Sequence, residues 1–266
     1  MDAAEHEELV VSEKIVEPSK SKGVRRNQVQ SVSRAVDVLD VLANANKPLA
    51  TADIAAELGL DRTVVHRLLR TLAPRGLVAE DRGQYSLGPS HVLYSNRYLD
   101  RLLFRKISLP YAVDFQNRAL IGKPWVTTLA IAREDSVYVT DRIWTPSTSL
   151  SAILELGEIF PIDESSIGLC MLAYQDLTDV KKVLGDERFE AVEPVLAEIR
   201  NNGGIALFHS ARRGISGMSA PIIDGSSEVV GGIGFTGPHM ENDLSASSEI
   251  ADQLRITASA ISRGFP

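Results

Sequence analysis

Residues 51–72 read TADIAAELGLDRTVVHRLLRTL, a run with the spacing of two short helices joined by a tight turn. In its second half the apolar residues recur at the i, i+3, i+4, i+7 period of one helix face, and they are Val65, Leu68, Leu69 and Leu72. The opposite face carries polar and mostly cationic side chains, which are Arg62, Thr63, His66, Arg67 and Arg70. Asp61 is placed to cap this helix, and Gly59 supplies the left-handed residue that the turn requires. The run therefore predicts a helix-turn-helix whose second helix can enter a DNA major groove.

The segments on either side complete a winged helix. Thr51 is expected to cap the first helix of the turn, whose inward-facing residues are Ile54, Ala55 and Leu58. Farther upstream, a third amphipathic helix is expected to pack on these two through Val32, Ala35, Val36, Leu39 and Leu42. Downstream, the β-rich runs 77–80 and 84–87 flank Asp81-Arg82-Gly83, which predicts a hairpin, the wing.

Two interpretations fit amphipathic helices of this kind. A small helical bundle with solvated arginines would show the same apolar stripes. Three helices, a cap, a turn glycine and a wing in this order are instead typical of a DNA-binding domain, which is the interpretation we favour. On it, the polar face of the second helix contacts bases and the nearest phosphates, while Arg34 and Arg82 contact the DNA backbone. The expected partner is double-stranded operator DNA.

The charge of the chain is distributed unevenly. The whole chain has 28 Lys+Arg against 35 Asp+Glu, which alone argues against a nucleic-acid partner. Residues 23–97 nevertheless hold ten basic and seven acidic side chains, whereas residues 98–266 hold fifteen and twenty-two. The positive excess in the first segment is modest and permits phosphate contacts, so the helix pattern remains the stronger evidence.

The length of 266 residues allows two domains. We expect a disordered tail at 1–24, a winged helix at 25–89, a linker helix at 90–108 and a larger domain at 109–266. The chain has no apolar run long enough to span a bilayer, and its first residues are acidic, which predicts a cytoplasmic protein with no membrane partner. A single cysteine and five scattered histidines indicate neither a disulfide nor a metal site, and no cofactor is expected.

The linker segment carries a broad apolar stripe, made of Tyr94, Tyr98, Leu99, Leu102 and Leu103. Two partners fit this stripe equally well: the same helix of a second chain, or the second domain of its own chain. In the first case a homodimer, or a dimer of dimers, would read the two halves of a palindrome.

Strand and helix signals alternate beyond Pro110. Strands are expected at 125–131, 136–143, 205–209, 217–223 and 228–236. Helices are expected at 165–174, 176–184, 186–201 and about 244–262. This order predicts an α+β fold in which helices cover an antiparallel or mixed sheet.

These motifs resemble the isocitrate lyase regulator (IclR) family of bacterial transcription factors over about residues 28–263. In the first domain the matching runs are 52–60, 65–69, 76–78 and 85–88, together with Leu72. In the second domain the matching residues are Gly157, Pro161, Gly168, 172–173, 214–215, 219–222 and 233–238. The resemblance implies an N-terminal winged helix-turn-helix, a linker helix and a C-terminal GAF-like effector-binding domain, with dimers or tetramers on a palindromic operator.

The resemblance also implies that the second domain binds a small-molecule effector, often a carboxylate or aromatic acid. The residues that it assigns to the effector pocket are Leu154, Leu156, Ser165, Ser166, Cys170, Met218, Ser219, Phe235 and Thr236. The chain departs from the family pattern at Asp163, at 208–210 and at Gly234, where a histidine, an acidic residue and a hydroxyl are common. If Asp163 faces the pocket, it would repel a carboxylate unless it were protonated or paired. The alternative, which we favour, is that Asp163 caps the helix beginning near Ser165.

Other patterns are weaker. Residues 232–237 fit the glycine fingerprint of dinucleotide binding, but no helix follows them to receive a pyrophosphate. Cys170 lies among apolar residues and is a buried small hydrophobe or, as the alternative, a pocket residue. We find no catalytic motif, so an enzyme or metabolite carrier with a non-DNA N-terminal module is the weaker hypothesis. The favoured function is a metabolite-modulated transcriptional regulator, and a repressor in particular; a regulator without any ligand is the alternative.

Overall fold

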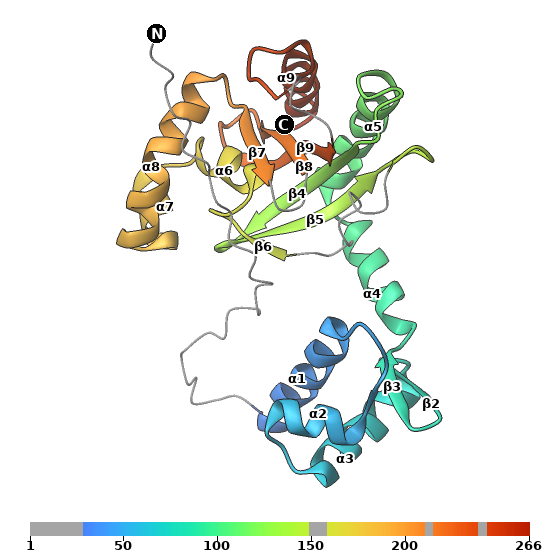
Figure 1. Ribbon diagram of the computed structural model, residues 1–266. Coiled ribbons are helices and arrows are strands. Elements are labelled where there is room, and N and C mark those ends of the chain that lie inside the picture. The colour runs from blue at the N-terminus through green and yellow to red at the C-terminus, as the bar shows by residue number, and fades with distance from the viewer. Residues whose placement is uncertain (1–28, 149–158, 211–214, 239–243) are drawn as a thin grey trace. The chain divides into compact units, whose positions relative to one another are not determined.

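The computed structural model describes residues 29–148, 159–210, 215–238 and 244–266 (Figure 1). Contacts divide these residues into two units, the first ending at Arg101 and the second beginning at Leu102. The tail expected at 1–24 lies outside the described residues. Within the described ranges, no helix combines the length and the apolar character needed to cross a membrane.

The first unit is a set of helices with a small antiparallel sheet of order β1-β3-β2. Its elements are α1 (Gln30–Asn44), β1 (Leu49–Ala50), α2 (Thr51–Leu58), α3 (Arg62–Leu72), the 3-10 turn η1 (Ala73–Arg75), β2 (Val78–Asp81), β3 (Gln84–Leu87) and α4 (Ser90–Leu99). One apolar core joins α1, α2, α3 and the hairpin, and its buried side chains include Val38, Ile54 and Leu69. The predicted winged helix is therefore confirmed, with one short strand, β1, that the sequence pattern did not reveal.

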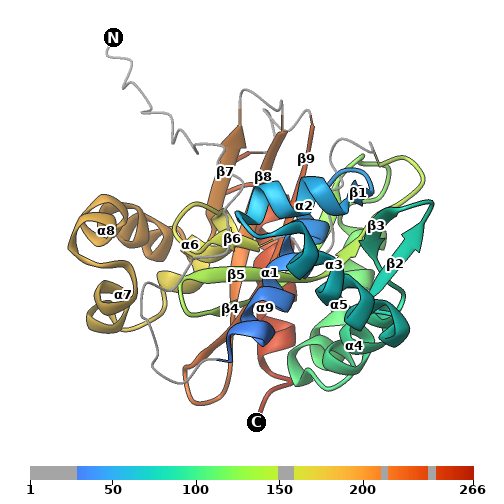
Figure 2. The same cartoon turned by 90° about the horizontal axis from the view of Figure 1, so that it is seen from below.

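Two turns of the first unit have the geometry that their residues predict. Gly59 lies between α2 and α3 with φ +61° and ψ 32°, a left-handed conformation that glycine adopts without strain. The β2–β3 turn places Arg82 and Gly83 at φ +52° and +79°, as the two-residue turns favoured in hairpins require. Figures 1 and 2 show this hairpin at one side of α1, α2 and α3.

The start of α2 differs from the prediction. Thr51 does not cap the helix but is its first residue, and its side chain is buried. The preceding residue, Ala50, has no side-chain oxygen that could accept a hydrogen bond from the start of the helix. Instead, the side chain of Asp53 within the helix reaches back, and its Oδ2 accepts the Ala50 backbone N–H at 3.2 Å.

The buried face of α1 also differs. Val38, Val41 and Leu42 are buried, whereas Val32 and Val36, which were expected in the core, are 60% and 50% exposed. Because α1 is apolar on more than one side, its helical period alone did not decide which face packs on α2 and α3.

The linker helix expected at 90–108 is interrupted. Helix α4 ends at Leu99, and α5 (Leu103–Arg118) begins only after Leu102, whose backbone is extended with ψ 110°. The interruption coincides with the division between the two units. The apolar period continues through Leu99, Leu102 and Leu103, which explains why the sequence predicts a single helix here.

The second unit is built on an antiparallel sheet whose order, in the described residues, is β6-β5-β4-β9-β8-β7. Its strands are β4 (Val126–Arg133), β5 (Ser136–Ile143), β6 (Ile159–Pro161), β7 (Ala206–Ser210), β8 (Ile215–Ile223) and β9 (Val229–Pro238). Helices α5 and α9 (Glu249–Ser262) pack on one face of this sheet. On the other face lie α6 (Ser166–Leu172), α7 (Leu177–Leu184) and α8 (Asp186–Asn201), with α7 beside α8 (Figure 2). These layers confirm the predicted α+β fold.

Strand alternation separates the two faces on the central strand β9. Ile233 and Phe235 belong to the core under α5 and α9, where the Phe235 ring stacks on Trp125 at 5.6 Å. Gly232, Gly234 and Thr236 alternate with them and therefore face α6. The run 232–237 is thus the middle of a strand, not a phosphate-binding turn.

Helix α9 begins at Glu249, five residues later than the expected 244. The Ser248 hydroxyl accepts the Ala251 N–H at 3.3 Å and caps the helix there, while donating to the Ser245 carbonyl at 2.7 Å. Serine side chains that bond to the local backbone compete with helix formation, so the helix begins only after Ser248.

Candidate functional site

Helix α3 starts at Arg62 because Asp61 caps it. The Asp61 Oδ1 atom accepts the Thr63 backbone N–H at 2.7 Å, as predicted. Hydrogen bonds from Thr63 hold the pKa of Asp61 below its ordinary value, so the capping carboxylate is ionised at neutral pH.

The two sides of α3 differ sharply in exposure. Val65, Leu69 and Leu72 are buried against the core of the first unit, and Leu68 is half-buried. The predicted DNA-reading residues are all exposed, and they are Arg62, Thr63, His66, Arg67 and Arg70. One helix therefore presents these five side chains to solvent, and hence to any ligand that approaches this side.

The other two predicted DNA contacts lie on different elements. The Arg82 side chain is 93% exposed at the tip of the hairpin, and its Nε lies 3.9 Å from Asp81, which is 91% exposed. An ion pair with both side chains exposed and such a long N–O distance contributes little to stability. Arg34 is half-buried on α1.

In the second unit, two of the predicted pocket residues form the start of α6. The Ser165 hydroxyl accepts the Gly168 N–H at 3.1 Å and caps the helix. The buried Ser166 hydroxyl lies 2.9 Å from that of Ser219 on β8, which ties α6 to the sheet. Thr236 lies on the same face of β9, and its Oγ1 is buried without a hydrogen-bond partner among the described residues.

Other predicted pocket residues lie in the cores. Met218 and Phe235 are fully buried under α5 and α9. Cys170 is fully buried among α6 to α8, where burial raises the pKa of its thiol, so it is an inert small hydrophobe. Leu154 and Leu156, with the motif residues Gly157 and Gly214, lie outside the described residues.

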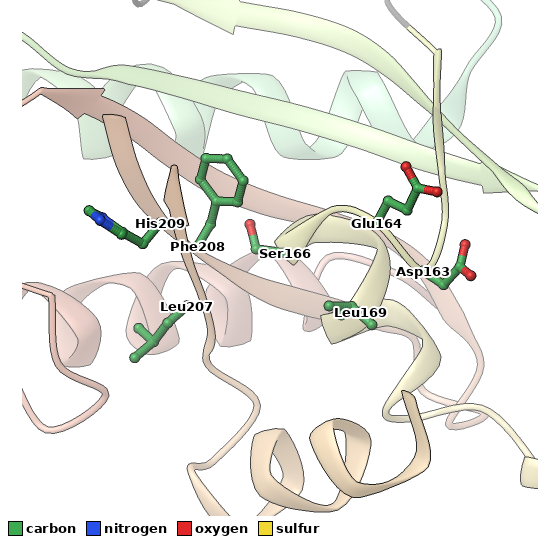
Figure 3. A pocket seen from close by; sticks show the side chains of 7 residues that line it. All are labelled: Asp163, Glu164, Ser166, Leu169, Leu207, Phe208 and His209. Atoms are coloured by element: carbon green, nitrogen blue, oxygen red, sulfur yellow. The ribbon is translucent and has the colours of Figure 1, made fainter. Parts of the chain in front are cut away.

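A small hollow of about 30 Å³ lies between the start of α6 and β7, lined by Asp163, Glu164, Ser166, Leu169, Leu207, Phe208 and His209. Figure 3 shows Phe208 on one side of β7 and Leu207 and His209 on the other. Apart from Ser166, none of these was assigned to the pocket from sequence. The only signal was that 208–210 and Asp163 depart from the family pattern.

Asp163 does not cap α6, contrary to the favoured interpretation. Ser165 holds that position, and Asp163 instead accepts two hydrogen bonds from Arg188 of α8, at 2.7 Å from Nε and 2.5 Å from Nη2. Arg188 also donates to Asp135 in the β4–β5 turn at 3.3 Å, and the two carboxylates raise its pKa. The Asp163 side chain is only 9% exposed. Its negative charge, beside the hollow, is neutralised by Arg188, which lies 25 residues further along the chain.

A winged helix with a cationic reading helix, followed by a separate α+β unit, defines a two-domain DNA-binding regulator. Residues 31–82 match the IclR helix-turn-helix domain, and residues 123–263 match the bacterial transcriptional regulator IclR C-terminal domain. The chain belongs to the IclR family of bacterial transcriptional regulators, whose members are not enzymes.

The chain is similar over most of its length to curated regulators. The glycerol operon regulatory protein of Streptomyces griseus is 27% identical over 248 residues, covering 88% of this chain and 96% of the relative. The HTH-type transcriptional regulator BhcR of Paracoccus denitrificans is 28% identical over 252 residues, covering 89% of this chain and 88% of the relative.

Solved structures share the fold. An IclR transcriptional regulator from Alicyclobacillus acidocaldarius matches with a TM-score of 0.71 at 24% identity, covering 89% of this chain and 98% of its own. An IclR homologue from Microbacterium hydrocarbonoxydans, crystallised with 4-hydroxybenzoate, matches with a TM-score of 0.71 at 21% identity, covering 87% and 97%.

Proposed function

We propose that this regulator is a repressor whose operator binding is modulated by a small organic or aromatic acid bound in the second unit. The observation that carries the proposal is that one chain combines an exposed cationic reading helix with a second unit that has a small hollow beside buried hydroxyl groups. The first feature suits a DNA groove, and the buried hydroxyl groups of the second unit can donate hydrogen bonds to a small polar molecule or accept them from it.

On the DNA side, the exposed face of α3 lies in the major groove. Arg62, Thr63, His66 and Arg67 occupy the first two turns, the part of a reading helix that contacts base edges, and Arg70 follows one turn later. Arginine donates two hydrogen bonds to guanine, which makes Arg67 the main candidate for base reading. Arg34 and Arg82 contact the phosphate backbone.

Replacing Arg82 by alanine is expected to weaken binding about equally on operator and unrelated DNA. Its exposed guanidinium at the hairpin tip contacts a phosphate in this proposal, so its loss lowers the slope of log K against log salt concentration by about 1. Fluorescence anisotropy titrations at several salt concentrations measure this slope. A loss of affinity confined to the operator would instead assign Arg82 to base reading.

On the effector side, the hollow opens next to Ser166, whose hydroxyl contacts Ser219. The pairing of Asp163 with Arg188 removes the charge repulsion that an unpaired carboxylate would impose on an acid. The structural neighbour crystallised with 4-hydroxybenzoate supports an aromatic acid as a candidate, and the relatives named for a glycerol operon add three-carbon compounds.

We also propose that the active assembly is a homodimer, or a dimer of dimers, formed partly through α4. This helix has no buried residue, and it exposes Val92, Leu93, Tyr94 and Tyr98. Exposed apolar side chains concentrated on ten residues suit an interface between copies of the chain. Two reading helices on such a dimer would match a palindromic operator.

The test is selection of genomic DNA by the purified full-length protein, followed by gel-shift titration of the enriched site. Titrations with and without glycerol, glycerate and a panel of aromatic acids measure effector response, and sedimentation velocity measures the assembly. A palindromic site released by one compound supports the whole proposal. A site that no compound affects would support a ligand-independent regulator, and the absence of any enriched site would contradict the assignment of α3 as a reading helix.

A further inference from the structure

We infer that Arg142 of β5 anchors the acidic group of the effector, on the face of the second-unit sheet that is covered by α6. This inference rests on the proposed effector role of the second unit and specifies the chemistry of the ligand. Arg142 is one of the few buried charged residues of the described chain, with 7% of its surface exposed, and neither the sequence pattern nor the family resemblance singled it out.

The strand register places Arg142 in line with the predicted pocket. Arg142 pairs with Thr128 of β4, Thr128 pairs with Gly234 of β9, and Gly234 pairs with Ser219 of β8. Residues directly opposite one another in antiparallel strands share a face, so these four residues form one row across the sheet. Ser219 contacts Ser166 of α6, which identifies the face as the one that α6 covers.

The neighbouring residue confirms the direction of Arg142. Asp141 accepts hydrogen bonds from Arg105 of α5 at 2.9 and 3.1 Å and therefore points to the opposite face, where α5 and α9 pack. Successive side chains of a strand alternate between faces, so Arg142 points toward the α6 face.

Hydroxyl groups occupy two of the other three positions of this row, and two more lie beside it. Thr128, Ser166 and Ser219 are all at least 90% buried. Thr236 lies two residues after Gly234 on the same face of β9, and its buried Oγ1 atom has no hydrogen-bond partner in the described residues. A buried hydroxyl without a hydrogen bond is unfavourable, and a ligand atom that accepts one from Thr236 would remove that cost.

The two ends of the row lie apart on the sheet. Arg142 and Ser219 are three strand spacings apart, about 14 Å between Cα atoms. Gly234 contributes no side chain between them, and the Ser219 hydroxyl fills the space above it, because a Cβ atom at position 234 would lie 2.4 Å from Ser219 Oγ. A guanidinium at one end and hydroxyls at the other suit a small hydroxy acid.

The charges of the surrounding residues favour an anion over a neutral compound. Two neighbouring carboxylates, Asp141 on the same strand and Asp163 before α6, each bind an arginine of their own, Arg105 and Arg188. The guanidinium of Arg142 is always protonated and has five N–H donors, so it can contact the protein and a carboxylate together. Arginine binds carboxylates through paired hydrogen bonds, which gives both affinity and orientation.

The test compares acids with their neutral analogues by isothermal titration calorimetry on the full-length protein. The pairs are 4-hydroxybenzoate with 4-hydroxybenzamide, and glycerate with glycerol. We expect at least one acid to bind and its neutral analogue to bind at least tenfold more weakly. Arg142→Gln should weaken binding of that acid by about 10- to 100-fold, and Arg142→Lys by less, because it keeps the charge.

The matched control is Arg133→Gln on the adjacent strand β4, which removes an exposed arginine whose side chain bonds only to a neighbouring carbonyl in the described structure. It should leave acid binding unchanged. Circular dichroism and melting curves establish that each variant is folded, and Arg142→Lys keeps the test decisive if Arg142→Gln is unstable.

A second variant acts at the other end of the row. Thr236→Val keeps the shape of the side chain but removes the hydroxyl without a partner, so we expect the melting temperature to rise by roughly 2–4 °C. The same change should weaken acid binding about five- to tenfold. Higher stability with lower affinity distinguishes a ligand contact from a structural role. A lower melting temperature would contradict the assignment of this hydroxyl to the ligand.

The outcomes separate this inference from the proposed function. If an acid binds and changes operator affinity, but Arg142→Gln binds it as tightly as the wild type, the anchor is wrong and the effector role stands. If neutral analogues bind as well as acids, the anion class is overturned. If no compound binds while operator binding is intact, both the anchor and effector modulation are overturned, and the DNA-binding function remains.

Discussion

Replacing Arg67 by alanine is expected to weaken binding to the operator by about 10- to 100-fold, with little effect on folding. Arg67 is exposed on α3 beside His66, and its side chain makes no hydrogen bond or ion pair within the described structure. A guanidinium that donates two hydrogen bonds to one base contributes about 1–3 kcal/mol of discrimination. Gel-shift titrations on operator and unrelated DNA, with melting curves of both proteins, measure the two effects.

The matched control for this variant is Arg75→Ala. Arg75 is also exposed and cationic but ends the 3-10 turn after α3, away from the first turns of the reading helix. We expect it to change operator affinity far less than Arg67→Ala. Equal losses for the two variants would mean that net charge, and not base reading, explains binding; no loss for Arg67→Ala would contradict the docking of α3 in the major groove.

Replacing Gly168 by alanine is expected to destabilise the second unit by about 3 kcal/mol and to lower its melting temperature by roughly 10 °C. A Cβ atom at position 168 would lie 1.9 Å from the carbonyl oxygen of Ile162 and 2.7 Å from its carbonyl carbon. The obstacle is backbone, so the segment that enters α6 must move. That movement would also disturb the Ser166–Ser219 contact and the Asp163–Arg188 pair.

Gly225→Ala is the matched control. Gly225 is exposed in the β8–β9 turn, and a Cβ atom there would lie 3.1 Å from the carbonyl oxygen of Pro266, at the end of the chain. We expect a change within about 0.5 kcal/mol. Thermal and urea unfolding measure both variants. A stable Gly168→Ala protein would show that α6 can shift without loss of packing.

Much of the fold was predictable because its signals are local. The α3 stripe, the Asp61 cap and Gly59 each depend on residues within one or two turns of one another, and the structure confirms all three. The β2–β3 hairpin likewise follows from its own turn residues, Arg82 and Gly83. The order of strands and helices was sufficient to predict the α+β class of the second unit.

The errors have a common cause, which is competition between local patterns and distant partners. Asp163 stands three residues before the first residue of α6 and fits a cap, yet Arg188 binds it from another helix. The apolar period through Leu102 predicts one linker helix, although the backbone is extended there. Neither the partner nor the break leaves a signal in the neighbouring sequence.

The effector site was the least predictable part. Family resemblance located α6 and the last strands, and it identified Ser166, Ser219 and Thr236 on one face. It could not separate them from Met218 and Phe235, which belong to the same strands but point into the core. Arg142 lies 77 residues from Ser219 in the chain and joins the row only through strand register.

The glycine at position 234 of β9 has an evolutionary consequence. Gly234 and Ser219 share one volume, because a Cβ atom on the glycine would lie 2.4 Å from the serine hydroxyl. A lineage that acquires a side chain at one member of such a pair must reduce its partner. We therefore expect inherited changes of ligand preference to arise as paired substitutions across neighbouring strands, while Ile233 and Phe235 on the opposite face stay constant in size.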